Sequence, residues 1–160
     1  MRAIVCHELG PAERLVVEEV EEPSPGPGEV VIEVHAAGLN FPDTLVISGK
    51  YQFKPELPFI PGGEAAGIVV RLGEGVCNFK PGDRVMTAGM MGAFAEKLCR
   101  PATDLIPMPG DMPFVTAAGF LVTYGTSYFA LKQRAALRAG ETLLVLGAAG
   151  GVGLAAVDLG

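Results

Sequence analysis

The stretch that decides the fold is Leu143-Leu144-Val145-Leu146-Gly147-Ala148-Ala149-Gly150-Gly151-Val152-Gly153. Its four consecutive apolar residues predict a buried strand, Thr142–Gly147, and the apolar residues Leu154–Val157 predict the start of a helix. A strand, a tight glycine turn and a helix can hold the pyrophosphate of a dinucleotide, because glycines let the backbone approach the phosphates. The glycine spacing is close to the fingerprint G-x-G-x-x-G but differs from it. A tight turn that binds nothing is the other interpretation.

The chain ends at Gly160, about two turns into this helix. A dinucleotide-binding domain needs further parallel strands and a ribose-binding residue about twenty positions on. We therefore expect the chain to be the front part of a longer protein. Without parallel neighbours, Thr142–Gly147 is expected either to make the isolated chain self-associate or to leave the segment after about Gly140 poorly ordered.

Composition excludes several classes of protein. The 160 residues are 49% hydrophobic, which suffices for one core with a small appendage. The net charge of −6 and the lack of a Lys/Arg cluster argue against nucleic acid or an anionic membrane as partner. There is neither a signal peptide nor an apolar run of about 18 residues. The cysteines, Cys6, Cys77 and Cys99, form no disulfide or metal-binding pattern. A cytoplasmic protein fits these features.

The first part of the chain has the pattern of a small β-barrel, with short strands separated by Gly- and Pro-rich turns. The predicted strands are Arg2–His7, Leu15–Val20, Glu29–Ala37, Gly62–Leu72, one starting at Arg84, Gly92–Cys99 and Leu105–Met108. Of these, Gly92–Cys99 is expected to pair with the strand that starts at Arg84. A short helix is predicted to begin near Pro42 and end at Gly49, and Tyr51–Pro61 is predicted to be a surface loop.

The pattern changes after Met112. Apolar residues at three- and four-residue spacing predict two Ala-rich helices, Phe114–Phe120 and Thr123–Leu137, before the glycine-rich stretch. The expected fold is mainly β with the start of an α/β domain. We place the domain boundary between residues 1–112 and residues 113–160.

Several motifs in this order resemble the medium-chain dehydrogenase/reductase superfamily, and most closely its zinc-free branch, the NADPH:quinone oxidoreductases. The matching stretches are Ala36–Asp43, Pro61–Gly67, Pro81–Val85, Thr123–Thr126 and Gly147–Gly153. The likeness runs from residue 1 to residue 160. It implies a GroES-like β-barrel in residues 1–112, then linking helices and the first βα unit of a Rossmann domain in residues 113–160, with the active site in the cleft between the two domains.

The same comparison argues against a metal site. In the zinc-dependent relatives a cysteine stands at the position of Asn40 and a histidine at that of Gly63, and neither residue present here can replace those ligands. The structural zinc lobe of those relatives needs four close cysteines, whereas residues 82–103 contain only Cys99. We therefore expect no metal.

The resemblance implies catalytic roles near the end of the barrel. It places Asn40 beside the nicotinamide and the substrate, although an asparagine here also suits a helix cap. Asp43 is expected to order the site or to act only as a structural acid in the first turn of the helix. Tyr51 lines the substrate pocket or packs on the surface, with equal support for both. Glu64 is expected to have a structural role.

The resemblance also implies which residues hold the cofactor, NADPH. It places Thr123 against the nicotinamide end, where an ordinary helix cap is the alternative. The pyrophosphate is expected at the glycine turn, on residues Gly147, Ala149, Gly150, Gly151, Val152 and Gly153.

The expected function is an NAD(P)H-dependent reductase of quinones or enones that transfers hydride directly, without metal. Two alternatives remain open: an enoyl-thioester reductase, and a non-catalytic NADPH-binding protein of the same superfamily. The partner is a small-molecule substrate, and the full protein is expected to be a homo-oligomer. The isolated chain is expected to bind NADPH weakly and to be inactive.

Overall fold

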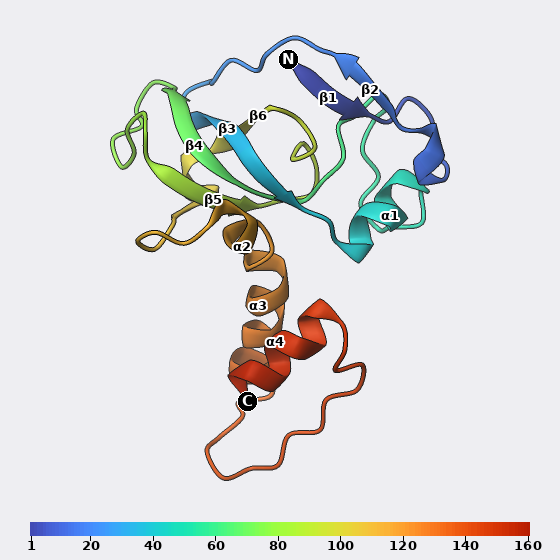
Figure 1. Cartoon of the computed structure of the whole chain (residues 1–160), viewed down its shortest axis with the longest axis vertical. Helices are drawn as coiled ribbons and strands as arrows, with labels where there is room; N and C mark the ends of the chain where they lie inside the picture. Colours follow the sequence, from blue (N-terminus) through green and yellow to red (C-terminus); the bar gives the residue numbers. More distant parts are fainter. The chain divides into compact units, whose positions relative to one another are not determined.

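The computed structural model describes residues 1–160, which divide into two compact units, Met1–Gly119 and Phe120–Gly160. The first unit is mainly β-sheet and the second is helical, so the predicted change from strands to helices is confirmed (Figure 1). The division between the units follows Gly119, after most of the first predicted Ala-rich helix, whereas the boundary predicted from the sequence lies before that helix, between residues 112 and 113.

The first unit contains seven strands. A five-stranded antiparallel sheet has the order β6-β3-β4-β5-β7, and β1 pairs with β2 in a separate two-stranded sheet. Isolated bridges from Ala3 to Ala95 and from Cys6 to Phe59 link the β1 segment to the rest of the unit. The bounds are β1 Arg2–Val5, β2 Val16–Glu19, β3 Glu29–Gly38, β4 Glu64–Leu72, β5 Arg84–Ala88, β6 Lys97–Pro101 and β7 Leu105–Pro107.

Consecutive buried residues, which are covered on both faces of the sheet, explain why β3 and β4 lie in its interior. Val30 and Ile32 of β3 are buried together with Val69 of β4 and Val85 of β5, and they form one apolar cluster. Burial of such side chains is the main source of stability. The strand β3 then leads directly into helix α1, Phe41–Ile47, so the core of the sheet fixes where this helix begins.

One predicted strand pairing is wrong. Of the predicted strand Gly92–Cys99 only residues 97–99 lie in a strand, β6, and this strand pairs with β3 and not with the strand that starts at Arg84. Both edges of β5 are already occupied, because β4 pairs with one edge and β7 with the other. Nearness in sequence suggested a hairpin, but the pairing follows the long-range order of the sheet.

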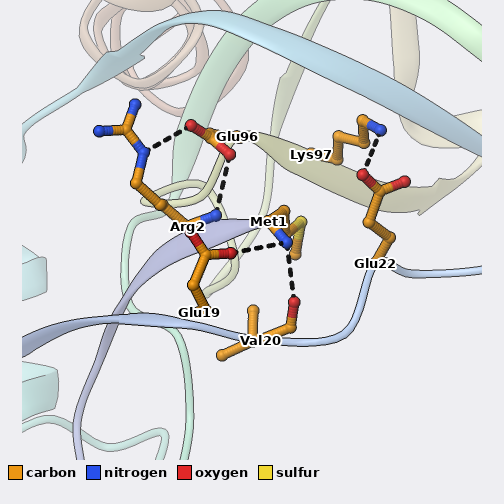
Figure 2. Close-up of polar contacts among 7 residues, drawn as sticks. All are labelled: Met1, Arg2, Glu19, Val20, Glu22, Glu96 and Lys97. Atoms are coloured by element: carbon orange, nitrogen blue, oxygen red, sulfur yellow. Dashed lines mark hydrogen bonds and ion pairs between the residues drawn. The ribbon is translucent and has the colours of Figure 1, made fainter.

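Polar contacts hold the N-terminal segment together and attach it to Glu96 and Lys97 at the start of β6 (Figure 2). The Arg2 side chain and backbone nitrogen both donate to the Glu96 carboxylate at 2.8 Å. The Met1 ammonium lies 3.2 Å from Glu19, and Lys97 donates to Glu22 at 2.5 Å. At least one partner of each pair is exposed, so the pairs contribute little stability and mainly fix the position of the strands.

Helix α2, Phe114–Ala118, completes the first unit by packing against β3 and β4. The Arg84 guanidinium lies 4.6 Å from the centre of the Phe114 ring and donates to the carbonyl oxygens of Gly110 and Met112. The His35 ring stacks on the same phenyl ring at 4.4 Å. Two strands thereby fix the first turn of α2.

The second unit contains helix α3, Leu121–Tyr128, a π-helical stretch, Phe129–Arg134, and helix α4, Gly151–Leu159. The predicted helix Thr123–Leu137 is therefore present from Thr123 to Arg134, with a change of winding after Tyr128. No helix of the chain combines the length and apolar character needed to cross a bilayer.

The predicted strand Thr142–Gly147 is wrong for this chain. The segment has no strand partner and runs as an open loop that reaches the turn before α4 (Figure 1). Leu144 and Leu146 are 81% and 85% exposed. A strand exists only where a second backbone accepts its hydrogen bonds, and no other segment of the chain does so here.

Candidate functional site

Asn40 stands between the last residue of β3 and the first turn of α1. Its backbone is extended (φ −120°, ψ 152°), as suits a residue that caps a helix. Asn40 and Asp43 form a capping box, in which each side chain faces the backbone N–H of the other residue. The capping role considered for Asn40 is thus present in the structure, and it leaves part of the side-chain amide for other contacts.

Asp43 is buried beneath this turn, with 6% of its surface exposed. Its carboxylate accepts a hydrogen bond from the Asn40 N–H at 2.7 Å and another from the N–H of Gly63. Burial raises the pKa of Asp43 above its ordinary value, and the two N–H donors offset this in part. Asp43 therefore joins the start of α1 to the entry of β4, which gives it an ordering role at this site.

Glu64, the first residue of β4, is 1% exposed and contacts Asn40 directly. The Asn40 Nδ2 donates to Glu64 Oε2 at 3.1 Å, across a separation of 24 residues. Glu64 is paired in the sheet with Gly38, where a Cβ would lie 2.9 Å from the same carboxylate oxygen. The missing side chain at Gly38 leaves room for the carboxylate to reach Asn40.

Gly63 occupies a tight position next to a second loop. Its carbonyl accepts from the N–H of Gly89 at 2.7 Å, and a Cβ on Gly63 would lie 2.9 Å from the Gly89 carbonyl oxygen. A larger residue such as histidine requires this loop to move. No group of three or more His, Cys, Asp or Glu side chains in the chain is arranged to hold a metal ion.

Tyr51 is half-buried and packs against an apolar cluster rather than standing free. The cluster consists of Cys6, Val46, Ile47 and Phe59, with Leu15 and Tyr51 at its margin. The ring thus helps to attach α1 and the following loop to the N-terminal strands. This contact corresponds to the packing alternative for Tyr51.

The glycine turn in the second unit is shaped by close backbone contacts. Gly147 has a positive φ of 72°, and its carbonyl accepts from the Gly150 N–H at 3.1 Å. A Cβ on Gly153 would lie 2.3 Å from that same carbonyl oxygen. Gly150 precedes α4, whose first-turn N–H groups have no partner within the helix. The arrangement suits an anionic group at this turn.

Helix α3 supports this turn from the side. A Cβ on Gly151 would lie 3.0 Å from the methyl group of Thr123, and Ser127, which is 1% exposed, donates to the Val152 carbonyl at 2.7 Å. The Thr123 hydroxyl also donates to the Phe120 carbonyl at 3.4 Å, as expected near a helix start. The structure therefore brings Thr123 together with Gly151 and Val152, while Asn40, Asp43 and Tyr51 belong to the other unit.

Sequence reasoning missed the contact between Glu64 and Asn40. Neither periodicity nor local spacing indicates a side-chain contact between the end of β3 and the beginning of β4. The usable signal in the sequence was Gly38, whose missing side chain leaves room for the Glu64 carboxylate. The hydrogen bond from Ser127 to the Val152 carbonyl in α4 was also missed, because a single serine in an apolar helix forms no recognisable pattern.

A comparison with known protein families matches residues 26–110 to the alcohol dehydrogenase GroES-like domain. The chain belongs to this family. It is 46% identical over 160 residues to the quinone oxidoreductase-like protein 2 homolog of Nematostella vectensis, covering 99% of this chain and 43% of that protein. The resemblance to quinone oxidoreductases inferred from the sequence is therefore confirmed. The chain spans about half the length of the curated relatives it matches.

Solved structures give the same relationship. The human synaptic vesicle membrane protein VAT-1 homolog-like protein has a TM-score of 0.96 and 40% identity, with 99% of this chain and 52% of that chain covered. The Escherichia coli quinone oxidoreductase complexed with NADPH has a TM-score of 0.94 and 36% identity, with 99% and 49% covered. The mainly β fold followed by the start of a nucleotide-binding domain is thus established for this family member.

Proposed function

We propose that this chain belongs to an NADPH-dependent reductase of quinones or related conjugated carbonyls. The observation that carries the proposal is the turn Gly147–Gly153 before α4, in which the glycines permit backbone contacts that a side chain would block. The proposal is supported by relatives that are named quinone oxidoreductases and by a similar structure that was solved with NADPH. NADPH, when bound, would supply the hydride.

Different residues of this chain would bind the pyrophosphate, the nicotinamide and the substrate. The turn, with Gly147, Ala149, Gly150, Gly151, Val152 and Gly153, would hold the pyrophosphate through backbone N–H groups. Thr123, which lies beside Gly151, would contact the nicotinamide end. Asn40 would offer a side-chain N–H to the substrate or to the nicotinamide carboxamide, with Asp43 ordering the loop that carries it.

We further propose that hydride transfer needs no metal. Asn40 and Gly63 stand where zinc ligands occur in zinc-dependent relatives, and neither offers a thiolate or an imidazole. Reduction of a quinone or an enone yields a delocalised anion, so one hydrogen-bond donor suffices to polarise the oxygen that becomes negative. Tyr51, which is half-buried at the margin of the cluster around Phe59, would contribute its remaining surface to the wall of the substrate pocket.

The first test is NADPH oxidation, followed by absorbance, in the longest natural protein that carries this sequence. A naphthoquinone and a crotonyl thioester are offered separately, and turnover of the quinone supports the proposal. Asn40→Ala should lower kcat/KM for the quinone about 100-fold if its N–H stabilises the transition state. Asn78→Ala, at an exposed position, is the matched control and should have no effect.

A second test addresses the cofactor alone. Ala149→Asp places a carboxylate in the turn and should weaken NADPH binding by more than about tenfold, because it repels the phosphates. Ala139→Asp is the control, since it adds the same charge at another exposed alanine of the same unit. Equal effects of the two variants would contradict the proposed phosphate site.

One specific observation favours a second candidate, a protein that binds NADPH without catalysis. A structure with 40% identity is named a synaptic vesicle membrane protein homolog-like protein, and that name describes no reaction. NADPH binding without turnover of either substrate would support this candidate, and turnover only of the thioester would indicate an enoyl-thioester reductase.

We also propose that the full protein is cytoplasmic and homo-oligomeric. Cell fractionation tests the location, and analytical sedimentation tests the oligomeric state.

A further inference from the structure

We infer that Glu64 is a positioning residue that fixes the orientation of the Asn40 side-chain amide, so that Nδ2 faces β4 and one N–H remains for a ligand. The use of that N–H by a substrate or cofactor rests on the function proposed above. The orientation itself depends only on contacts within the first unit.

The chemistry of the two groups sets the orientation. The nitrogen of Asn40 and not its oxygen faces Glu64, and an amide nitrogen can only donate while the carboxyl oxygen accepts. The observed distance from Nδ2 to Oε2 is 3.1 Å, and Glu64 is 1% exposed. Hydrogen bonds to charged groups in such buried places are stronger than those between neutral groups. The reversed amide would bring two oxygens together and lose this bond.

The Asn40 side chain also lies at the first turn of α1 as part of the capping box, where the N–H of Asp43 donates to the Asn40 backbone carbonyl at 3.0 Å. An amide has two N–H donors and an oxygen with two lone pairs. With one donor directed at Glu64, the second N–H is the donor that Asn40 offers outside this cluster.

Glu64 is itself held firmly enough to serve as a reference point. As the first residue of β4 it is paired with Gly38 on one side and with Ala88 on the other. Gly38 has no side chain in the path of the carboxylate, and the carbonyl of Ala118 closes the position from the side of α2. A donor that is oriented before the ligand arrives avoids reorganisation at the moment of reaction.

The orientation is tested by NMR of the 160-residue chain, without any ligand. In the wild type we expect contacts between the Nδ2 protons of Asn40 and the side-chain protons of Glu64, and one Nδ2 proton shifted by its hydrogen bond. Glu64→Met has similar length but no acceptor, and should move that resonance to the position of an exposed asparagine. Glu64→Gln keeps an acceptor oxygen and should retain the shift. Glu33→Met, on an exposed part of β3, is the control.

Two results would overturn the inference. The first is an unchanged Asn40 side-chain resonance in Glu64→Met while far-UV circular dichroism shows an intact fold. The second, which needs no variant, is the absence of contacts between Asn40 and Glu64 in the wild type. The second result keeps the inference testable if Glu64→Met does not fold.

A kinetic measurement separates this inference from the proposed function. In the full-length protein Glu64→Met should lower kcat about tenfold, the equivalent of one well-placed hydrogen bond, Glu64→Gln should restore most of it, and Glu33→Met should change nothing. An NMR shift without a change in kcat would support the orientation and contradict the use of Asn40 in catalysis. No NMR shift would contradict the orientation, whatever the activity.

Discussion

Gly38→Ala should be among the most damaging small substitutions in the chain. A Cβ at this position would lie 2.2 Å from the carbonyl oxygen of Ala118 and 2.9 Å from Glu64 Oε2. For ordinary contact at 3.4 Å, β3 and the end of α2 must move apart by about 1.2 Å. The nearest obstacle is the Ala118 backbone, which cannot turn away as a flexible side chain can. The shift would also displace Asn40, two residues further on.

The magnitude follows from two opposing effects. Overpacking of a tight site costs about 1–3 kcal/mol, whereas replacing glycine by alanine gains about 0.4–1 kcal/mol by restricting the unfolded chain. We expect a net loss of about 1–2 kcal/mol, which lowers Tm by roughly 2–8 °C in a chain of this length. Because the chain contains no tryptophan, urea and thermal unfolding are best followed by far-UV circular dichroism.

Gly119→Ala is the matched control. This glycine ends α2, and the nearest atom to an added Cβ would be 4.0 Å away. The control should therefore be as stable as the wild type or slightly more stable. If Gly38→Ala were as stable as Gly119→Ala, the close packing of β3 against α2 described above would be refuted.

Three further predictions concern other positions. Gly125→Ala, inside α3 with no atom within 4 Å of the added Cβ, should stabilise the chain by up to about 1 kcal/mol in thermal unfolding; a loss would mean that this face of α3 is covered. Ser127→Ala should cost about 1 kcal/mol, because the bond to the Val152 carbonyl is lost, whereas Ser24→Ala, which is exposed, should cost nothing. Burial raises the pKa of Asp43 above 3.8, so its contribution to stability is full below pH 3.8 and falls as the pH rises through the folded-state pKa. The wild type should therefore lose unfolding free energy relative to Asp43→Asn as the pH rises above 3.8. A difference between the two proteins that does not change with pH would show that the Asp43 carboxyl has an ordinary pKa.

Local patterns were sufficient for most elements of the first unit. The alternation in Glu29–Ala37 predicts a strand that the structure extends by one residue, and Pro42 lies in the first turn of the helix predicted there. Such elements are determined by residues close in sequence. The wrong partner for Lys97–Pro101 has the opposite cause, since strand order depends on contacts between residues far apart.

The site was predictable to a similar extent. The sequence alone indicates Asn40 as a helix cap and Asp43 as an acid in the first turn, whereas the capping box that joins them is seen only in the structure. The link from Asn40 to Glu64 joins the end of one strand to the beginning of another, and only the folded sheet brings them within 3.1 Å. The glycine turn was recognised from its spacing, but the strand expected before it requires a partner backbone that this chain does not provide.

The open segment before α4 also affects how the isolated chain would survive in a cell. Proteases bind their substrates as extended backbone, adding a strand to their own cleft. Residues 141–145 have no strand partner, and the leucines at 144 and 146 are almost fully exposed. Cleavage here would separate α4 from α3 and leave the sheet of the first unit intact. The same residues that predict a buried strand thus become, without neighbours, the preferred point of degradation.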